Sequence, residues 1–152
     1  MGTDALIQFK DLGLAAALAF AAVGSALGTG IASMAAVGAW KKGFAQNKPA
    51  PFILTIFAGA PLTQTVYGMI LMNIMTKAVS QGNYLWSVGI LCGIAIGASA
   101  LMQGKAGAVA ADALGETGKG FGSYLAVIGI IETVALFVLA FAWLLLGRLV
   151  GA

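Results

Sequence analysis

One acidic residue, Glu132, stands in the middle of an apolar stretch that spans residues 121–150. The other acidic residues lie at or near the ends of apolar stretches: Asp4, Asp11, Asp112 and Glu116. A carboxylate near the middle of a bilayer costs roughly 2.5–3.5 kcal/mol on insertion scales, so it normally has a partner, a proton or a metal ion. Glu132 is therefore the first candidate for a functional residue.

Polar side chains in other apolar stretches share the predicted depth of Glu132. If the chain reverses at residues 117–118, Gln103 and Glu132 are equally far from the turn. With a rise of roughly 1.5 Å per residue, they are then level in an antiparallel helix pair. The polar layer predicted in this way comprises Thr63, Gln64, Gln103 and Glu132, with Thr133 as a further candidate.

A proline precedes two members of this layer. Pro61 has no N–H for the carbonyl of Phe57, and its ring opens a helix locally. Broken helices in membranes often present free carbonyls to cations. The hydroxyl of Tyr67, one turn beyond Thr63, is within reach of the same layer. A turn at residues 46–47 would likewise place Thr29 level with Gln64.

The candidate ligands are all oxygen atoms: a hydroxyl, two side-chain amides, a carboxylate and a backbone carbonyl. Hard cations favour such a set. The single negative charge of Glu132 neutralises a monovalent ion, whereas a divalent ion would leave a buried positive charge. We therefore predict Na⁺ as the ligand, with H⁺ as the alternative. A proton needs only the carboxyl group and one or two acceptors.

The composition indicates which elements must carry this layer. The chain has 152 residues, of which 61% are hydrophobic and 9% charged, against about 25% charged in a soluble domain. This is typical of an integral membrane protein, with no room for a separate catalytic domain. The net charge of +3 and scattered lysines argue against nucleic-acid binding. The first apolar stretch follows Asp4, Lys10 and Asp11 and is too long for a cleaved signal peptide.

Four apolar segments exceed the roughly 20 residues that a helix needs to cross the hydrocarbon core. They are approximately Leu12–Trp40, Phe52–Lys77, Tyr84–Leu114 and Phe121–Val150. Their short connections predict antiparallel helical hairpins. Three lysines lie in residues 41–51 and Lys119 lies in residues 115–120. The positive-inside rule therefore places these two segments in the cytoplasm, with both termini outside.

The two hairpins are predicted to be copies of one another, with residues 1–80 forming the first and residues 81–152 the second. The segment from Ser25 to Ala32 aligns with the segment from Ser99 to Ala106, and Gln64-Thr65-Val66 aligns with Glu132-Thr133-Val134. Gln64 thus occupies in the first hairpin the place that Glu132 has in the second.

Small residues are concentrated in the first and third segments, and bulky ones in the second and fourth. Glycine and alanine ladders let helix backbones approach closely. Helices near a symmetry axis have the least room, so the pattern favours a closed homo-oligomeric ring with helices 1 and 3 inside and helices 2 and 4 outside.

The chain resembles the proteolipid (c or K) subunits of prokaryotic V-type and A-type rotary ATPases, and the sodium-translocating type in particular. The resemblance rests on three motifs and covers nearly the whole chain. The motifs read Pro61-Leu62-Thr63-Gln64-Thr65-Val66-Tyr67-Gly68, Gln103-Gly104-Lys105 and Glu132-Thr133. The family commonly has a larger residue at the position of Ala60 and glycine at that of Thr65.

The resemblance implies a ligand set and a mechanism. The side chains of Thr63, Gln64, Gln103 and Glu132 and the carbonyl of Ala60 would bind Na⁺, and Tyr67 would donate a hydrogen bond to the carboxylate. A homo-oligomeric ring in the lipid of a prokaryotic cell membrane would turn against a stator subunit whose arginine competes for Glu132. Central-stalk rotor subunits would couple this rotation to a separate soluble head, so the chain itself would not be an enzyme.

A small proton-coupled multidrug exporter is the alternative from another class, since it too is built around one membrane carboxylate. Such a transporter is expected to line a cavity with aromatic residues near the acid. Glu132 has aliphatic neighbours in the sequence, and its predicted partners at the same depth are amides. These features favour the rotor subunit.

Overall fold

The computed structural model describes residues 3–150, and the side chains of residues 12–149. The side chains of Asp4, Lys10 and Asp11 lie outside this part. The described chain is helical, without strands: α1 (Thr3–Ala45), α2 (Leu54–Gly59), the 3-10 turn η1 (Ala60–Leu62), α3 (Thr63–Ser80), α4 (Trp86–Thr117) and α5 (Phe121–Val150). Since α2, η1 and α3 form one span, this part has four membrane-length spans of 27 to 34 residues. The prediction of an all-α membrane protein with four spans is confirmed.

Two predicted connections are shorter than the sequence pattern indicated. The segment 41–51 was expected to be a loop, but α1 continues to Ala45. The segment 115–120 was also expected to be a loop, but α4 continues to Thr117. Hydropathy marks where apolar side chains end, whereas a helix continues until its backbone hydrogen bonds are interrupted.

Specific residues end these helices. Beyond α1, Asn47 has a positive φ of 54°, and Pro49 and Pro51 follow in an irregular segment. Beyond α4, Gly118 has a φ of 65°, and its N–H donates to the carbonyl of Leu114 over 2.8 Å. Glycine adopts this left-handed conformation without steric cost, which suits it to close a helix.

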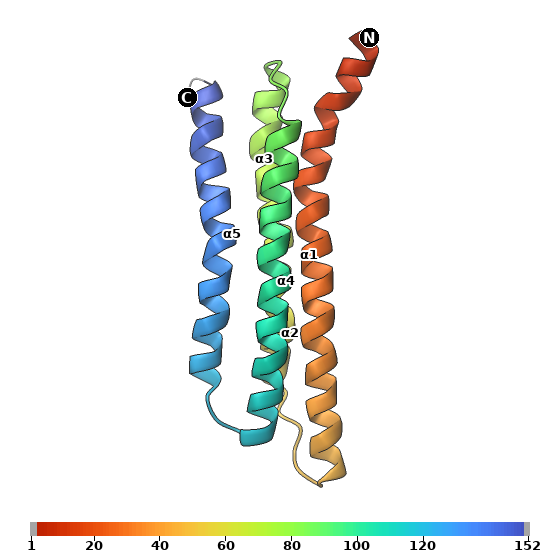
Figure 1. Cartoon of the computed structure of the whole chain (residues 1–152), viewed down its shortest axis with the longest axis vertical. Coiled ribbons are helices and arrows are strands. Elements are labelled where there is room, and N and C mark those ends of the chain that lie inside the picture. Colours follow the sequence, from red (N-terminus) through yellow and green to blue (C-terminus); the bar gives the residue numbers. More distant parts are fainter. Residues whose placement is uncertain (1–2, 151–152) are drawn as a thin grey trace.

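Helices α1 and α4 pack closely along their length (Figure 1). Glycines on each helix lie against the backbone of the other. A Cβ atom added to Gly93 would lie 2.7 Å from the carbonyl oxygen of Ala16, and one added to Gly24 would overlap the backbone of Gly97. The expected function of the small residues in close helix packing is thus observed in this pair.

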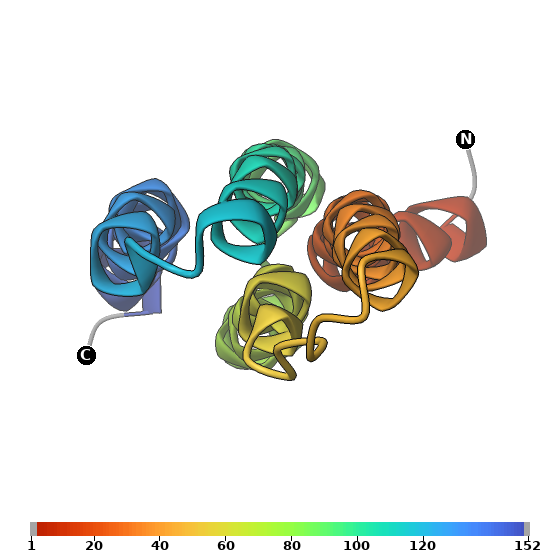
Figure 2. The same ribbon diagram turned by 90° about the horizontal axis from the view of Figure 1, so that it is seen from below.

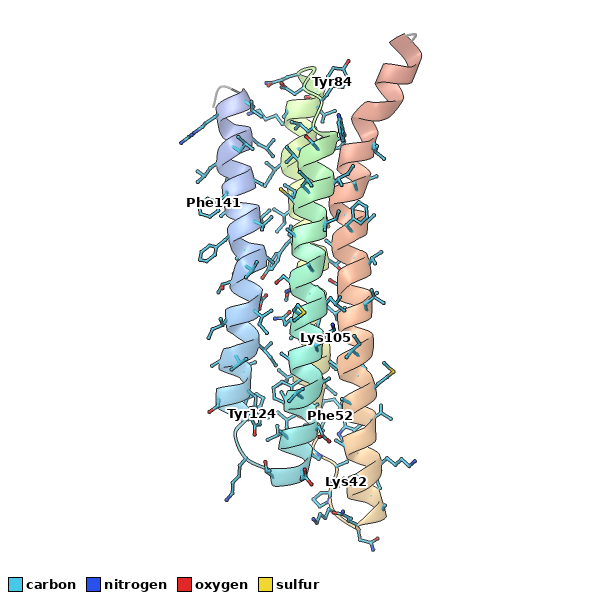
Figure 3. All side chains as sticks on the ribbon, in the orientation of Figure 1. Lys42, Phe52, Tyr84, Lys105, Tyr124 and Phe141 are labelled. Carbon is cyan, nitrogen blue, oxygen red and sulfur yellow. The ribbon has the colours of Figure 1, made fainter. Side chains whose placement is uncertain are left out.

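The other two spans pack against this pair (Figure 2). Helices α2 and α3 occupy the groove between α1 and α4, where Gly68 of α3 allows contact with Ala17 and Ala21 of α1. Helix α5 contacts α4 and α3. Its outer face is bulky, and Phe141 points away from the other helices (Figure 3). The faces of α3, α4 and α5 that meet contain the candidate site.

Candidate ion-binding site

The second span is interrupted at Pro61, as the sequence predicted. Helix α2 ends at Gly59, one 3-10 turn contains the proline, and α3 begins at Thr63. In this turn the carbonyl of Ala60 accepts the N–H of Thr63, a bond between residues three apart rather than the four of an α-helix. The interruption therefore alters the backbone hydrogen bonding directly beside the polar residues of α3.

A hydroxyl and two other oxygen atoms gather at this interruption. The Oγ1 atom of Thr63 donates to the carbonyl oxygen of Ala60 over 3.0 Å and lies 3.1 Å from Oε1 of Gln64. Three oxygen atoms from residues 60 to 64 of one span are thus close together. Tertiary contacts with α4 and α5 add the remaining groups.

A chain of hydrogen bonds links the three helices. Gln64 of α3 donates from Nε2 to Oε1 of Gln103 of α4 over 2.8 Å. Gln103 in turn donates from Nε2 to Oε2 of Glu132 of α5 over 3.4 Å. The hydroxyl of Tyr67 donates to Oε1 of Glu132 over 2.6 Å. The structure therefore brings together the six residues that the resemblance implies: Ala60, Thr63, Gln64, Tyr67, Gln103 and Glu132.

The amides are the most deeply buried members of this cluster. The side chains of Gln64 and Gln103 are both 0% exposed, whereas Glu132, Thr63 and Tyr67 are partly exposed at the surface of the isolated chain. A buried amide without hydrogen bonds would be costly, so each glutamine needs the partners it has here. The carboxylate thus lies at the edge of a polar layer whose interior consists of neutral groups.

Two further candidates for this layer are not part of it. Thr133 is exposed, and its hydroxyl donates to the carbonyl of Ile130 in its own helix over 2.6 Å. Thr29 forms no side-chain hydrogen bond to the cluster, and its buried hydroxyl has no partner among the described residues. The depth prediction for Thr29 is wrong because the irregular segment after Asn47 shifts the return helix along α1.

The shifted register is visible in the contacts of α1. A Cβ atom on Gly28 would lie 3.0 Å from the side chain of Pro61. Gln64 therefore lies about one helical turn away from the level of Thr29, since a turn contains about 3.6 residues. The assumption of a symmetric turn fails for the first connection and holds for the second.

Two contacts near Glu132 were not expected from the sequence. The hydroxyl of Ser99 donates to the carbonyl of Ile131 over 2.9 Å, and Nε2 of Gln103 donates to the carbonyl of Ile128 over 3.2 Å. Backbone carbonyls carry no sequence signal. The available clue was the spacing of Ser99 and Gln103, which puts both on one face of a helix.

The fold and this cluster define a multi-pass membrane protein with one carboxylate held between its helices. Residues 86–145, which comprise α4 and most of α5, match the model of the ATP synthase C-subunit family. That family consists of non-catalytic proteolipid subunits, which agrees with the expectation that the chain is not an enzyme. No curated protein matches the chain.

Proposed function

We propose that the chain is the rotor-ring subunit of a prokaryotic V-type or A-type rotary ATPase and carries Na⁺ across the membrane on Glu132. The observation that supports this most directly is the convergence of α3, α4 and α5 on one carboxylate. The match of the second hairpin to the ATP synthase C-subunit family supports the rotor function in general. The oxygen atoms beside Glu132 support Na⁺ in particular.

The cluster becomes a cation site by rotation of its amide groups. Gln103 directs Nε2 toward Glu132 and Oε1 toward Gln64. A half-turn of this amide would direct its oxygen to a cation held by Glu132. The oxygen atoms of Ala60, Thr63 and Gln64 already lie close together and would complete the set of ligands.

The electrostatic balance favours a monovalent ion. Glu132 is the one acidic residue predicted at this depth, and the other candidate ligands are neutral. One Na⁺ would make the site neutral, which lets it face lipid during rotation without the cost of a bare charge. H⁺ is the alternative coupling ion, for which the hydrogen bond from Tyr67 would also be suitable.

The proposed ring rests on the contrast between slim and bulky helices in hairpins 1–80 and 81–152. Slim helices α1 and α4 would line the inside, and the bulkier α3 and α5 would face outward with Glu132. A stator subunit would supply an arginine that displaces the ion, and central-stalk subunits would bind the ring at its cytoplasmic loops. Rotation would move each Glu132 from one half-channel to another.

Carbodiimide labelling of Glu132 in native membranes tests the proposal. Because a bound ion shields the carboxylate, Na⁺ should slow labelling at near-neutral pH, whereas K⁺ should not. Glu132→Gln is the control and should abolish labelling. Labelling that depends on pH alone would identify a proton rotor. An unreactive Glu132 in assembled wild-type protein would contradict the proposed site.

A further inference from the structure

Two side chains of α4 bind the backbone of α5 beside Glu132. Ser99 donates to the carbonyl of Ile131, the residue before Glu132, and Gln103 donates to the carbonyl of Ile128, one turn earlier. Ser99 is 6% exposed and Gln103 is 0% exposed, so both bonds lie inside the helix interface. These bonds fix one turn of α5 to one face of α4.

The hydroxyl of Ser99 has an unusual partner for a helical serine. Serine and threonine in membrane helices often bond to a carbonyl of their own helix, as Thr133 does with Ile130. Ser99 reaches the neighbouring helix instead. Its counterpart in the sequence repeat, Ser25, is 1% exposed, and its hydroxyl has no partner among the described residues. The bond to α5 is therefore particular to the hairpin with the acid.

We propose that Ser99 is a positioning residue that sets the depth and rotation of α5, and thereby holds the Glu132 carboxylate against Gln103 and Tyr67. This inference rests on the proposed ion-carrying function. Ser99 bonds to a backbone carbonyl and not to the carboxylate, so it acts through geometry. Lipid supplies no hydrophobic force that would hold α5 in one orientation, which leaves packing and such interhelical bonds to do so.

The bond from Ser99 to the carbonyl of Ile131 would prevent rotation of α5 about its axis. Side chains of successive residues point in directions about 100° apart around the helix axis. Rotation of α5 by part of this angle would therefore turn Glu132 away from its partners on α3 and α4. Gln103 alone cannot prevent this, because its amide must turn when it binds a cation. Ser99 provides a contact that remains in place while Gln103 changes its partner.

The test compares Ser99→Ala with Ser99→Thr, which keeps the hydroxyl, and with Ser25→Ala, which removes the unpartnered serine of the other hairpin. The readout is the Na⁺ concentration that halves carbodiimide labelling of Glu132 in membranes with equal amounts of assembled protein. We expect about a threefold to tenfold increase for Ser99→Ala, because one interhelical bond is lost. Ser99→Thr and Ser25→Ala should stay near the wild type.

A second readout does not need Na⁺ to be the ion. In sodium-free membranes, the pH of half-maximal labelling should differ from the wild-type value in Ser99→Ala. In Ser99→Thr it should match the wild-type value. If labelling of the wild type does not depend on Na⁺, the assignment of Na⁺ as the coupling ion is wrong. The pH readout would still test the role of Ser99. If Ser99→Ala matches the wild type in both readouts, or if Ser25→Ala has the same effect, the positioning role of Ser99 is wrong.

Discussion

The carboxylate of Glu132 has donors from two other helices. Tyr67 of α3 donates to Oε1, and Gln103 of α4 donates to Oε2. Bonds to a charged acceptor are stronger than bonds between neutral groups. In the proposed cation-bound state Gln103 would present its oxygen in place of its N–H, whereas the Tyr67 hydroxyl would keep its bond. Tyr67 would therefore orient the carboxylate in both states.

Replacement of Tyr67 by phenylalanine removes this bond and keeps the ring. The bond holds the carboxylate in place before a cation binds, and its loss adds the cost of ordering one side chain, about 0.5–1.5 kcal/mol, to cation binding. We therefore expect the Na⁺ concentration that halves labelling to rise about twofold to tenfold. The measurement is carbodiimide labelling at several Na⁺ concentrations. Tyr124→Phe is the matched control, since Tyr124 lies near Gly120 at the end of the bundle. Unchanged protection in Tyr67→Phe would contradict the role of this hydroxyl.

At the scale of helices, close packing and a helix break have separate functions. The glycines of α1 and α4 bring two backbones into contact, which gives the bundle a rigid pair. Pro61 interrupts the span that packs against this pair, and beside the interruption the hydroxyl of Thr63 donates to the carbonyl of Ala60. Gln103 lies on α4 of this pair, and the interrupted span contributes the oxygen atoms of Ala60 and Thr63 to the site.

Alanine substitution of α1 glycines tests the packing. Gly24→Ala would force a methyl group into the backbone of Gly97, and we expect a loss of about 1–3 kcal/mol in the free energy of unfolding. Gly38→Ala is the control, because no atom lies within 4 Å of an added Cβ. It should be neutral or stabilise the helix by up to about 1 kcal/mol. Thermal unfolding in detergent, followed by circular dichroism, measures both. Equal stability would refute the close α1–α4 contact.

At the scale of the whole molecule, both hairpin connections lie at the same end of the bundle (Figure 1). Lys42 and Glu116 form an exposed ion pair of 2.8 Å between the ends of α1 and α4 there. Exposed pairs contribute little to stability. The concentration of lysines at this end matters more, because it predicts the cytoplasmic side.

Single cysteines in a Cys92→Ser background test this orientation. Lys48→Cys and Lys119→Cys should react with a membrane-impermeant maleimide from the cytoplasmic side, because both exposed residues lie in connections at one end. Gln81→Cys, in the connection between α3 and α4, should react only from the opposite side. Labelling of inverted and right-side-out vesicles measures this. Reaction of positions 48 and 119 from different sides would be inconsistent with the fold.

The sequence by itself determined the spans, the interruption at Pro61 and the polar side chains of the cluster, because hydropathy, proline and buried polar groups have strong local signatures. The carbonyl of Ala60 was expected only from the resemblance. The level pairing of Gln103 with Glu132 was also predictable, since the turn between α4 and α5 is short and nearly symmetric. The position of Thr29 relative to the cluster was not predictable, because it depends on the path of the irregular segment between α1 and α2.

Only the tertiary structure decided how the polar groups are connected. It turned Thr133 outward, directed the amide of Gln103 toward Glu132, and paired Ser99 with a backbone carbonyl. These outcomes depend on the rotation of α5 about its axis. Rotation is set by contacts between helices, and the order of residues along one helix does not specify it.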